Sequence, residues 1–553
     1  MKKIVLLALT IGMIACTEKN TPDNPGGSNG ADTTAVTPTD TTITTTDTIS
    51  ITWNGASAQV NGSHDGVTIT SENGFVTVNS TVKDMTYRLS GNGNGQLTIY
   101  GTNRHQLILS NLTLACADGP AINNQCKKSC FVVLAGANSL SDGSTYSDSD
   151  EDRKAAFFSE GQIIFSGSGS LNITGNYKHA LASDDYIQFA ESTGALTLTA
   201  ANDGIHANDG IYFDGGTFTI TAGSDGVQCD SLIVFNAGNL TITAEADGIQ
   251  SDTASIFING GTITVTNAGD KGITAFGNIN ITDGTIRVTS LYKCLKAGKK
   301  ENNTIVNAGN ILISGGDIQA ICTGASSQGG GRGGWGGDSS SDTSTPEAIE
   351  AKGTITISGG KVYAQSSDDA INATGDLTIS GGYVMAYSTG NDGIDANGNM
   401  YIKGGVVYAI CAGGAEVALD ANTEGGKKLY VQGGTIVAIG GLENGANLSQ
   451  TCYQATASNS TWYCLSGGSE DFIFKTPSSL STSTMVVSTG GTTALKSGVT
   501  VSGGTAILNN YAYTGASATG GSNVSLNTYS GNSGGGPGGG GGHGGGGGRP
   551  GGW

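Results

Sequence analysis

Acidic residues recur at intervals of about 22 residues through the middle of the chain, which could align them in rows. Asp203, Asp225 and Asp247 each begin an Asp-Gly pair, and Asp270 or Lys271 stands at the next interval. The remaining acidic candidates are Glu347, Glu350, Asp369, Asp392, Asp395 and Asp420. Closely spaced carboxylates repel one another unless a cation lies between them, and Ca²⁺ accepts irregular cages of carboxylate and carbonyl oxygens. These rows therefore predict calcium binding, although Asp-Gly is also ordinary turn chemistry, because Asp caps its own turn.

Basic residues cluster between the two acidic rows. They are Lys271, Arg287, Lys293, Lys296, Lys299 and Lys300. Lys293 and Lys296 are candidates for contact with the carboxylates of an acidic polysaccharide. Lys271 or Lys293 is the candidate general base if the protein is a polysaccharide lyase. The alternative is charge compensation on a solvated face. Lys271 and Lys293 also interrupt any continuous row of calcium ligands, so we expect two separate acidic sites.

Tyrosines form a third recurring set. Tyr363 and Tyr408 each follow a Gly-Gly pair by three residues, and Tyr387 follows such a pair by five. An exposed row of tyrosines would be a platform for sugar rings. The alternative is that the C-terminal segment covers this row, since large exposed apolar patches are uncommon.

Short strands must position these residues. An apolar residue, here called the pivot, follows the acidic position by two and repeats through the chain. The pivots are Ile205, Val227, Ile249, Ile273, Leu295, Ile349, Ile371, Ile394 and Leu419, with Phe158, Leu181 and Ile122 as candidates upstream. Gly-Gly pairs separate a short strand from a longer one in which apolar residues alternate with Thr. A fixed period of this length predicts an all-β, single-stranded parallel β-helix of about 22 residues per coil.

The N-terminus is typical of a secreted lipoprotein. Lys2 and Lys3 precede a short apolar run that ends at Ala15, directly before Cys16, so we expect cleavage there and lipidation of Cys16. The alternatives are a plain signal peptide and a membrane anchor. The predicted segments are a signal peptide (1–15), a disordered tether (16–48), a β-rich N-terminal cap with the first coils (49–140), the parallel β-helix (141–441) with a Gly/Ser-rich insertion (324–346), a β-rich closing segment (442–532) and a disordered Gly-rich tail (533–553).

Composition narrows the functional classes. The net charge of −19 argues against nucleic acid as a partner and fits a cation-binding surface. No HExxH, Walker, nucleophile-elbow or Cys-based zinc motif is present, and the five histidines do not cluster in the sequence. One disulfide could join Cys452 to Cys464, and another could join two of Cys116, Cys126 and Cys130 to each other. Cys229 is expected to be a buried thiol.

Several of these segments resemble those of one bacterial family. They are the Asp-Gly-Ile coils, the Gly-Gly-Thr corners, the segment from Gly136 to Gly143 and the Asp-Asp-Ala-Ile-Asn-Ala element from Asp368 to Ala373. The resembled family is the secreted, calcium-dependent carbohydrate-binding β-helix family described as cellulose- and polygalacturonate-binding, whose fold is similar to that of the family 9 pectate lyases. The resemblance implies a right-handed helix, binding rather than catalysis, and Asp369, Asp392 and Asp395 as calcium ligands.

We therefore predict a monomeric outer-membrane lipoprotein at the bacterial cell surface, which contacts the membrane through its lipid anchor only. Its predicted cofactor is calcium, and its predicted partner is an acidic, pectin-like or a cellulosic polysaccharide. One alternative is a calcium-dependent, pectate-type lyase, and another is a structural or adhesin solenoid.

Overall fold

The computed structural model describes residues 38, 42–45, 47–302, 304–325, 345–413 and 416–531. The described residues belong to one compact unit, Thr37–Trp553. The predictions for the signal peptide, Cys16, most of the tether, most of the insertion and the tail lie outside the described residues. No helix within the described ranges is long and apolar enough to cross a membrane.

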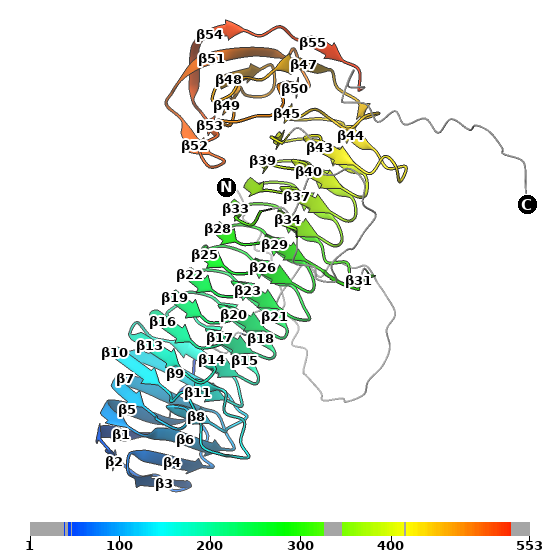
Figure 1. Ribbon diagram of the computed structural model, residues 1–553. Coiled ribbons are helices and arrows are strands. Elements are labelled where there is room, and N and C mark those ends of the chain that lie inside the picture. Colours follow the sequence, from blue (N-terminus) through cyan, green and yellow to red (C-terminus); the bar gives the residue numbers. More distant parts are fainter. Residues whose placement is uncertain are drawn as a thin grey trace, which may run out of the picture. The chain divides into compact units, whose positions relative to one another are not determined.

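Stacked coils of three short strands build the protein (Figure 1). One coil consists of β17 (Ile205–Ala207), β18 (Gly210–Phe213) and β19 (Thr217–Ala222). Each of these strands pairs in parallel with its counterparts in the coils before and after it. The described part of the chain contains strands but no helix. The predicted all-β parallel β-helix is therefore confirmed.

One face of the solenoid is a sheet of 15 strands, and it carries both acidic rows. Its members are β3 (Val67–Glu72), β4 (Phe75–Ser80), β6 (Gln96–Gly101), β8 (Ile122–Asn124), β11 (Ala155–Ser159), β14 (His179–Ser183), β17, β20 (Val227–Cys229), β23 (Ile249–Ser251), β26 (Lys271–Ala275), β29 (Lys293–Ala297), β34 (Glu347–Ala351), β37 (Ile371–Ala373), β40 (Ile394–Ala396) and β43 (Leu419–Ala421). All neighbouring strands in it are parallel except the hairpin β3–β4.

The pivots hold the register of this sheet and point into the core. Ile205 pairs with Val227, and Val227 with Ile249, and all three are buried. Upstream the register corrects the sequence prediction by one residue, because Phe157 rather than Phe158 pairs with Leu181. Cys229 is fully buried beside its pivot, as predicted. The longer strands alternate, so that Phe218 and Ile220 of β19 are buried while the threonines before, between and after them are exposed.

Glycine makes the corners possible. The second residue of the Gly-Gly pairs has a positive φ, for example 93° at Gly216 and 80° at Gly360. A side chain is strained in this left-handed region, and a Cβ at Gly360 would also lie 2.6 Å from the backbone oxygen of Gly315 in the preceding coil. The Gly-Gly repeat thus lets successive coils turn at the same place and stack closely.

The C-terminal segment covers one side of the last coils. A sheet of six antiparallel strands contains β48 (Trp462–Ser466), β49 (Phe472–Lys475), β51 (Ala494–Ser502), β52 (Thr505–Ile507), β53 (Ala512–Thr514) and β54 (Ser517–Asn523). Its apolar residues form a second core with Tyr363 and Tyr408, which are 1% and 0% exposed, and Tyr387 packs against this core. The predicted tyrosine platform for sugar rings is therefore wrong, and the covering alternative is correct.

The nine cysteines in the described part of the chain are all free thiols and all buried. The disulfides considered for Cys452 with Cys464, and within the group Cys116, Cys126 and Cys130, are not formed. Burial raises the pKa of Cys130 well above its ordinary value, so this thiol stays protonated. These cysteines therefore act as small apolar side chains in the core.

Candidate functional site

Side chains at two positions of each coil line the outer face of the 15-stranded sheet. One position lies two residues before the pivot, and the other directly follows it. The register shows that Lys271, Lys293 and Glu347 occupy the first position in three successive coils. Asp270 therefore does not belong to the row. Its Oδ2 atom instead lies 2.6 Å from Nζ of Lys271.

The acidic rows are held together by hydrogen bonds from one coil to the next. Oδ1 of Asp225 accepts a bond of 2.8 Å from the backbone N–H of Asp247, and Oδ1 of Asp247 accepts one of 2.8 Å from Lys271. In the second row, Oδ1 of Asp392 accepts a bond of 2.9 Å from Val417. Each of these aspartates thus caps the turn of the following coil. This arrangement uses one oxygen of each carboxylate and leaves the other for a partner outside the backbone.

Burial makes the charged form of these carboxylates energetically unfavourable. It raises the pKa of Asp225 to about 7 and that of Asp247 to about 6, with the neighbouring carboxylates adding to the shift. Lys271 is the nearest compensating charge, with Nζ 3.8 Å from Oδ1 of Asp247. Asp225 and Asp247 are therefore under electrostatic strain, and the row ends in a lysine.

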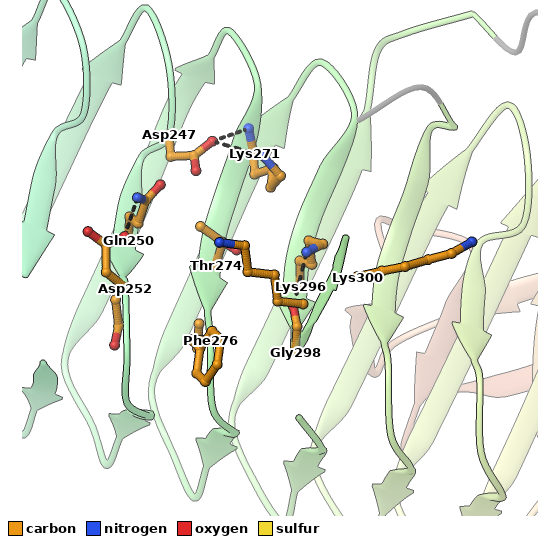
Figure 2. Close-up of a pocket in the computed structure, with 12 residues that line it drawn as sticks. Asp247, Gln250, Asp252, Lys271, Thr274, Phe276, Lys296, Gly298 and Lys300 are labelled. Carbon is orange, nitrogen blue, oxygen red and sulfur yellow. Dashed lines mark hydrogen bonds and ion pairs between the residues drawn. The ribbon is translucent and has the colours of Figure 1, made fainter. Parts of the chain in front are cut away.

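A pocket of about 190 Å³ opens where the first row meets the lysines. It is lined by Asp247, Gln250, Ser251, Asp252, Lys271, Thr274, Ala275, Phe276, Lys296, Gly298, Lys299 and Lys300. Figure 2 shows Lys271 reaching toward Asp247 of the neighbouring coil, with Lys296 and Gly298 one strand further along. Nζ of Lys296 donates to the backbone oxygen of Gly298 at 3.0 Å.

The pocket combines cations with one half-buried aromatic ring. Lys299, at the start of the hairpin β30 (Lys299–Glu301) and β31 (Thr304–Asn307), has a side chain that is 50% exposed and pairs with Glu301 at 2.8 Å. Phe276 directly follows β26 and is partly exposed. The sequence analysis missed Phe276, although it follows Ala275, the small inward residue of its coil. Cations, amides and an aromatic wall are suited to a polar ligand with apolar ring faces.

Lys293 lies below the surface in a buried ion-pair group. Its side chain is 1% exposed, and Nζ lies 2.6 Å from Oε2 of Glu347 and 3.5 Å from Oε2 of Glu350. Nζ also donates to the backbone oxygen of Thr345 at 2.8 Å, and Lys352 pairs with Glu350. Lys293 is therefore not placed to contact a polysaccharide or to act as a lyase base. Glu347 and Glu350 neutralise lysines, so the prediction that they bind calcium is not supported by their contacts.

A second acidic group forms further along the sheet, over β37, β40 and β43. Burial and mutual repulsion raise the pKa of Asp369 to about 7 and that of Asp392 to about 8, while burial raises the pKa of Asp395 to about 6. The amide nitrogen of Asn372 donates to Oδ2 of Asp369 at 2.9 Å and to Oδ2 of Asp395 at 3.2 Å. Asp420 adjoins this group, and burial together with Glu443 raises its pKa.

Asp203 differs from the other acidic residues because two histidines reach it. Nδ1 of His179 lies 3.1 Å from its Oδ2 atom, and Nδ1 of His206 lies 3.6 Å from the same oxygen. The sequence analysis missed His179, although it stands two residues before the pivot Leu181, in phase with the acidic row. Within the described ranges these three residues are the only group of three His, Cys, Asp or Glu whose ligand atoms all lie within 4.8 Å of one another.

This geometry defines the class of the protein, which is a parallel β-helix with a long polar face over one of its sheets. The model of a family described as carbohydrate-binding domain-containing protein matches residues 72–275 and 233–393, together more than half of the chain. The chain therefore belongs to this carbohydrate-binding domain family. The described residues of both matched ranges lie on the solenoid, and together they include the pocket, the first acidic row and the start of the second.

Among solved structures, the chain is similar to a polysaccharide lyase-like protein from C. thermocellum, determined as a gadolinium derivative. The identity is 20%, the TM-score is 0.31, and the match covers 50% of this chain and 96% of the other. No curated protein matches the chain.

Proposed function

We propose that this protein binds an extracellular polysaccharide along the outer face of the 15-stranded sheet, with its principal contacts in the pocket around Phe276, Lys299 and Lys300, since Lys296 is only 4% exposed. The observation that carries the proposal is the gathering of four lysines and an aromatic ring in one pocket of a chain with a net charge of −19. Membership of the carbohydrate-binding domain family supports it. The lysines favour an acidic, pectin-like glycan over neutral cellulose, because ammonium groups pair with uronate carboxylates.

The second part of the proposal is a calcium ion in the acidic group of Asp369, Asp392 and Asp395. Their raised pKa values mean that the charged carboxylates lack sufficient compensation, which a cation would supply. The Asn372 amide now donates to two of these carboxylates, and turning it over would present its oxygen as a further ligand. These residues fit calcium by donor chemistry, and backbone carbonyls or a glycan carboxylate would complete the coordination.

The lyase alternative has a weaker basis in the contacts. Lys271 lies in the pocket, but its ammonium group is paired with Asp270 and Asp247. Neighbouring carboxylates favour the charged ammonium form, which has no lone pair with which to accept a proton. We therefore favour binding without cleavage. A lipid anchor at Cys16 would hold such a binding protein at the cell surface.

The pocket is tested by calorimetric titration with polygalacturonate and with a soluble cellulose oligosaccharide. We expect binding of polygalacturonate that weakens with added salt, because ions screen the lysines. The double variant Lys299→Gln/Lys300→Gln should weaken binding by more than about tenfold, since one charge-assisted contact contributes about 1.5–3 kcal/mol. Phe276→Ala should also weaken binding, because it removes the aromatic wall against which a sugar ring would pack. The matched controls are Phe75→Ala, an exposed phenylalanine on β4 of the same sheet, and Lys427→Gln, an exposed lysine outside the pocket.

Equal loss in the pocket and control variants would contradict the proposed site, and no binding of either glycan would contradict the function. Release of unsaturated uronides during the titration would show that the protein is a lyase.

Calcium is tested separately by thermal unfolding with calcium and with a chelator, because a ligand that binds only the folded state raises the midpoint. Asp395→Asn should reduce the calcium-dependent rise, whereas Asp230→Asn, an exposed aspartate outside the acidic group, should not. An unchanged midpoint in the wild type would leave the acidic rows as turn chemistry.

A further inference from the structure

Two imidazoles and one carboxylate converge at the start of the first acidic row. His179 begins β14, and Asp203 and His206 lie at the next strand of the sheet, β17. His179 holds the same position before its pivot as Asp203 does one coil later. The rings of His179 and His206 are stacked with their centroids 4.5 Å apart. The regular stacking of coils thus delivers three potential metal ligands to one point on the sheet.

The separations of the ligand atoms are suited to a metal ion. Tetrahedral zinc with bonds of about 2.0–2.1 Å places its ligand atoms about 3.3 Å apart. The distances from Oδ2 of Asp203 to the two Nδ1 atoms are 3.1 and 3.6 Å, on either side of that value. Both Nδ1 atoms are buried, and neither makes a hydrogen bond of acceptable geometry within the described part of the chain. A shared metal ion would satisfy both nitrogens and the carboxylate oxygen together.

The surroundings fix the ligands in place. Oδ1 of Asp203 accepts a hydrogen bond of 3.1 Å from the backbone N–H of Asp225, which directs Oδ2 toward the histidines. The nearby cation Lys154 is compensated, because its Nζ lies 2.5 Å from Asp184 and 3.4 Å from Asp152. The His179 and Asp203 side chains are each 7% exposed and that of His206 is 15% exposed, so an ion reaches the site past His206.

We propose that His179, Asp203 and His206 bind one divalent first-row transition metal ion, for which Zn²⁺ is the first candidate. Two imidazole nitrogens and one carboxylate oxygen suit such ions, whereas Ca²⁺ prefers oxygen ligands alone. Three protein ligands leave a coordination position for water or for a ligand group. This site lies on the sheet of the proposed polysaccharide-binding face, but it does not depend on that function.

The test measures uptake of Zn²⁺ by equilibrium dialysis and the visible d–d absorption of bound Co²⁺, using the purified protein after treatment with a chelator. We expect one ion per chain, tetrahedral-type Co²⁺ absorption, and no displacement by excess Ca²⁺. His206→Gln should weaken Zn²⁺ binding by about 100-fold or more, because even the loss of an outer-shell partner costs about 10–100-fold. His179→Gln should have the same effect.

The matched control is His64→Gln, since His64 also lies near a carboxylate, with Nε2 3.4 Å from Asp47, but outside this three-ligand group. This variant should bind Zn²⁺ as the wild type does. His206 is the most exposed of the three ligands, so its variant is the one that least disturbs folding, and X-ray absorption of the Zn²⁺-loaded wild type gives a readout without any variant. Absence of imidazole scattering, or equal uptake by the wild type and His206→Gln, would overturn the proposal.

Discussion

Oδ1 of Asp203 accepts a hydrogen bond of 3.1 Å from the backbone N–H of Asp225, one coil further along the solenoid. The same link joins Asp225 to Asp247 at 2.8 Å and Asp369 to Asp392 at 3.1 Å. An aspartate that repeats with the coil length therefore connects each turn to the next. Its second oxygen is left out of this bond, and histidines meet it at Asp203 and an amide meets it at Asp369. The repeat thus serves the fold first, and the variation around it creates distinct sites.

Two variants of Asp225 distinguish the contribution of its hydrogen bond to the fold from the effect of its buried charge. Asp225→Ala removes the acceptor for the buried N–H of Asp247, and we expect it to lower the free energy of unfolding by about 1–3 kcal/mol. Asp225→Asn keeps an oxygen acceptor and removes a charge whose burial raises the pKa to about 7, so it should retain most of the stability. Urea unfolding of both variants checks this. Equal destabilisation by Asn and Ala would show that the charge, not the hydrogen bond, matters.

The buried pair of Lys293 and Glu347 predicts a strong dependence of each partner on the other. Lys293→Met should cost about 3–5 kcal/mol, because it leaves the Glu347 carboxylate buried without its closest cation. Adding Glu347→Gln should recover a large part of that loss, which a double-mutant cycle measures by urea unfolding. The double variant should still bind polygalacturonate as the wild type does. If the double variant keeps its stability but loses affinity for polygalacturonate, Lys293 belongs to the binding site after all.

The repeat made the fold predictable. Parallel strands pair residue by residue, so an apolar residue that returns at nearly constant spacing, such as Ile205, Val227 and Ile249, must fall in register. The sequence could also place Lys271 and Lys296 on one face beside Asp247. Phe158 shows the limit, because two adjacent phenylalanines fit the period almost equally well and only the observed register selects Phe157.

The sites were less predictable because they depend on contacts that the period does not contain. Lys293 and Glu347 are 54 residues apart across an insertion, yet they are neighbours in the sheet. Tyr408 looks exposed by alternation, but a segment after the last coil covers it. His179 was visible in phase with the acidic row, yet its meaning required the ring of His206 from the next coil.

Tyr408 anchors the C-terminal segment to the solenoid. Its hydroxyl donates to the backbone oxygen of Lys475 at 2.9 Å, and its ring packs against Phe472 and Phe474. Tyr408→Phe should cost about 1 kcal/mol through the lost hydrogen bond. Tyr408→Ala should cost about 3–5 kcal/mol through the cavity and make the segment 452–529 sensitive to limited proteolysis. Affinity for polygalacturonate should not change in Tyr408→Phe. A loss of affinity in this variant would support the rejected hypothesis that the tyrosines bind sugar rings.

His105 predicts how stability depends on pH. It is buried in β7 (His105–Ala115) beside the ring of Tyr87, and burial lowers its pKa to about 4. The unfolded chain, with an ordinary histidine pKa of about 6.5, binds a proton first as the pH falls. Stability due to neutral His105 is therefore complete above about pH 6.5, and it declines down to about pH 4 by as much as about 3 kcal/mol.

The matched variant is His105→Gln, which removes the titrating ring and keeps a polar side chain. Urea unfolding at about pH 7 and about pH 4.5 compares the two proteins. The wild type should lose more stability between these values than His105→Gln does, although other groups shift both proteins alike. Nε2 of His105 has no hydrogen-bond partner among the described residues, so the Gln variant loses no bond made by that atom. The Gln variant should accordingly be closest to the wild type at about pH 7 and the more stable of the two at about pH 4.5. Parallel pH profiles for the two proteins would exclude His105 as the source of the dependence.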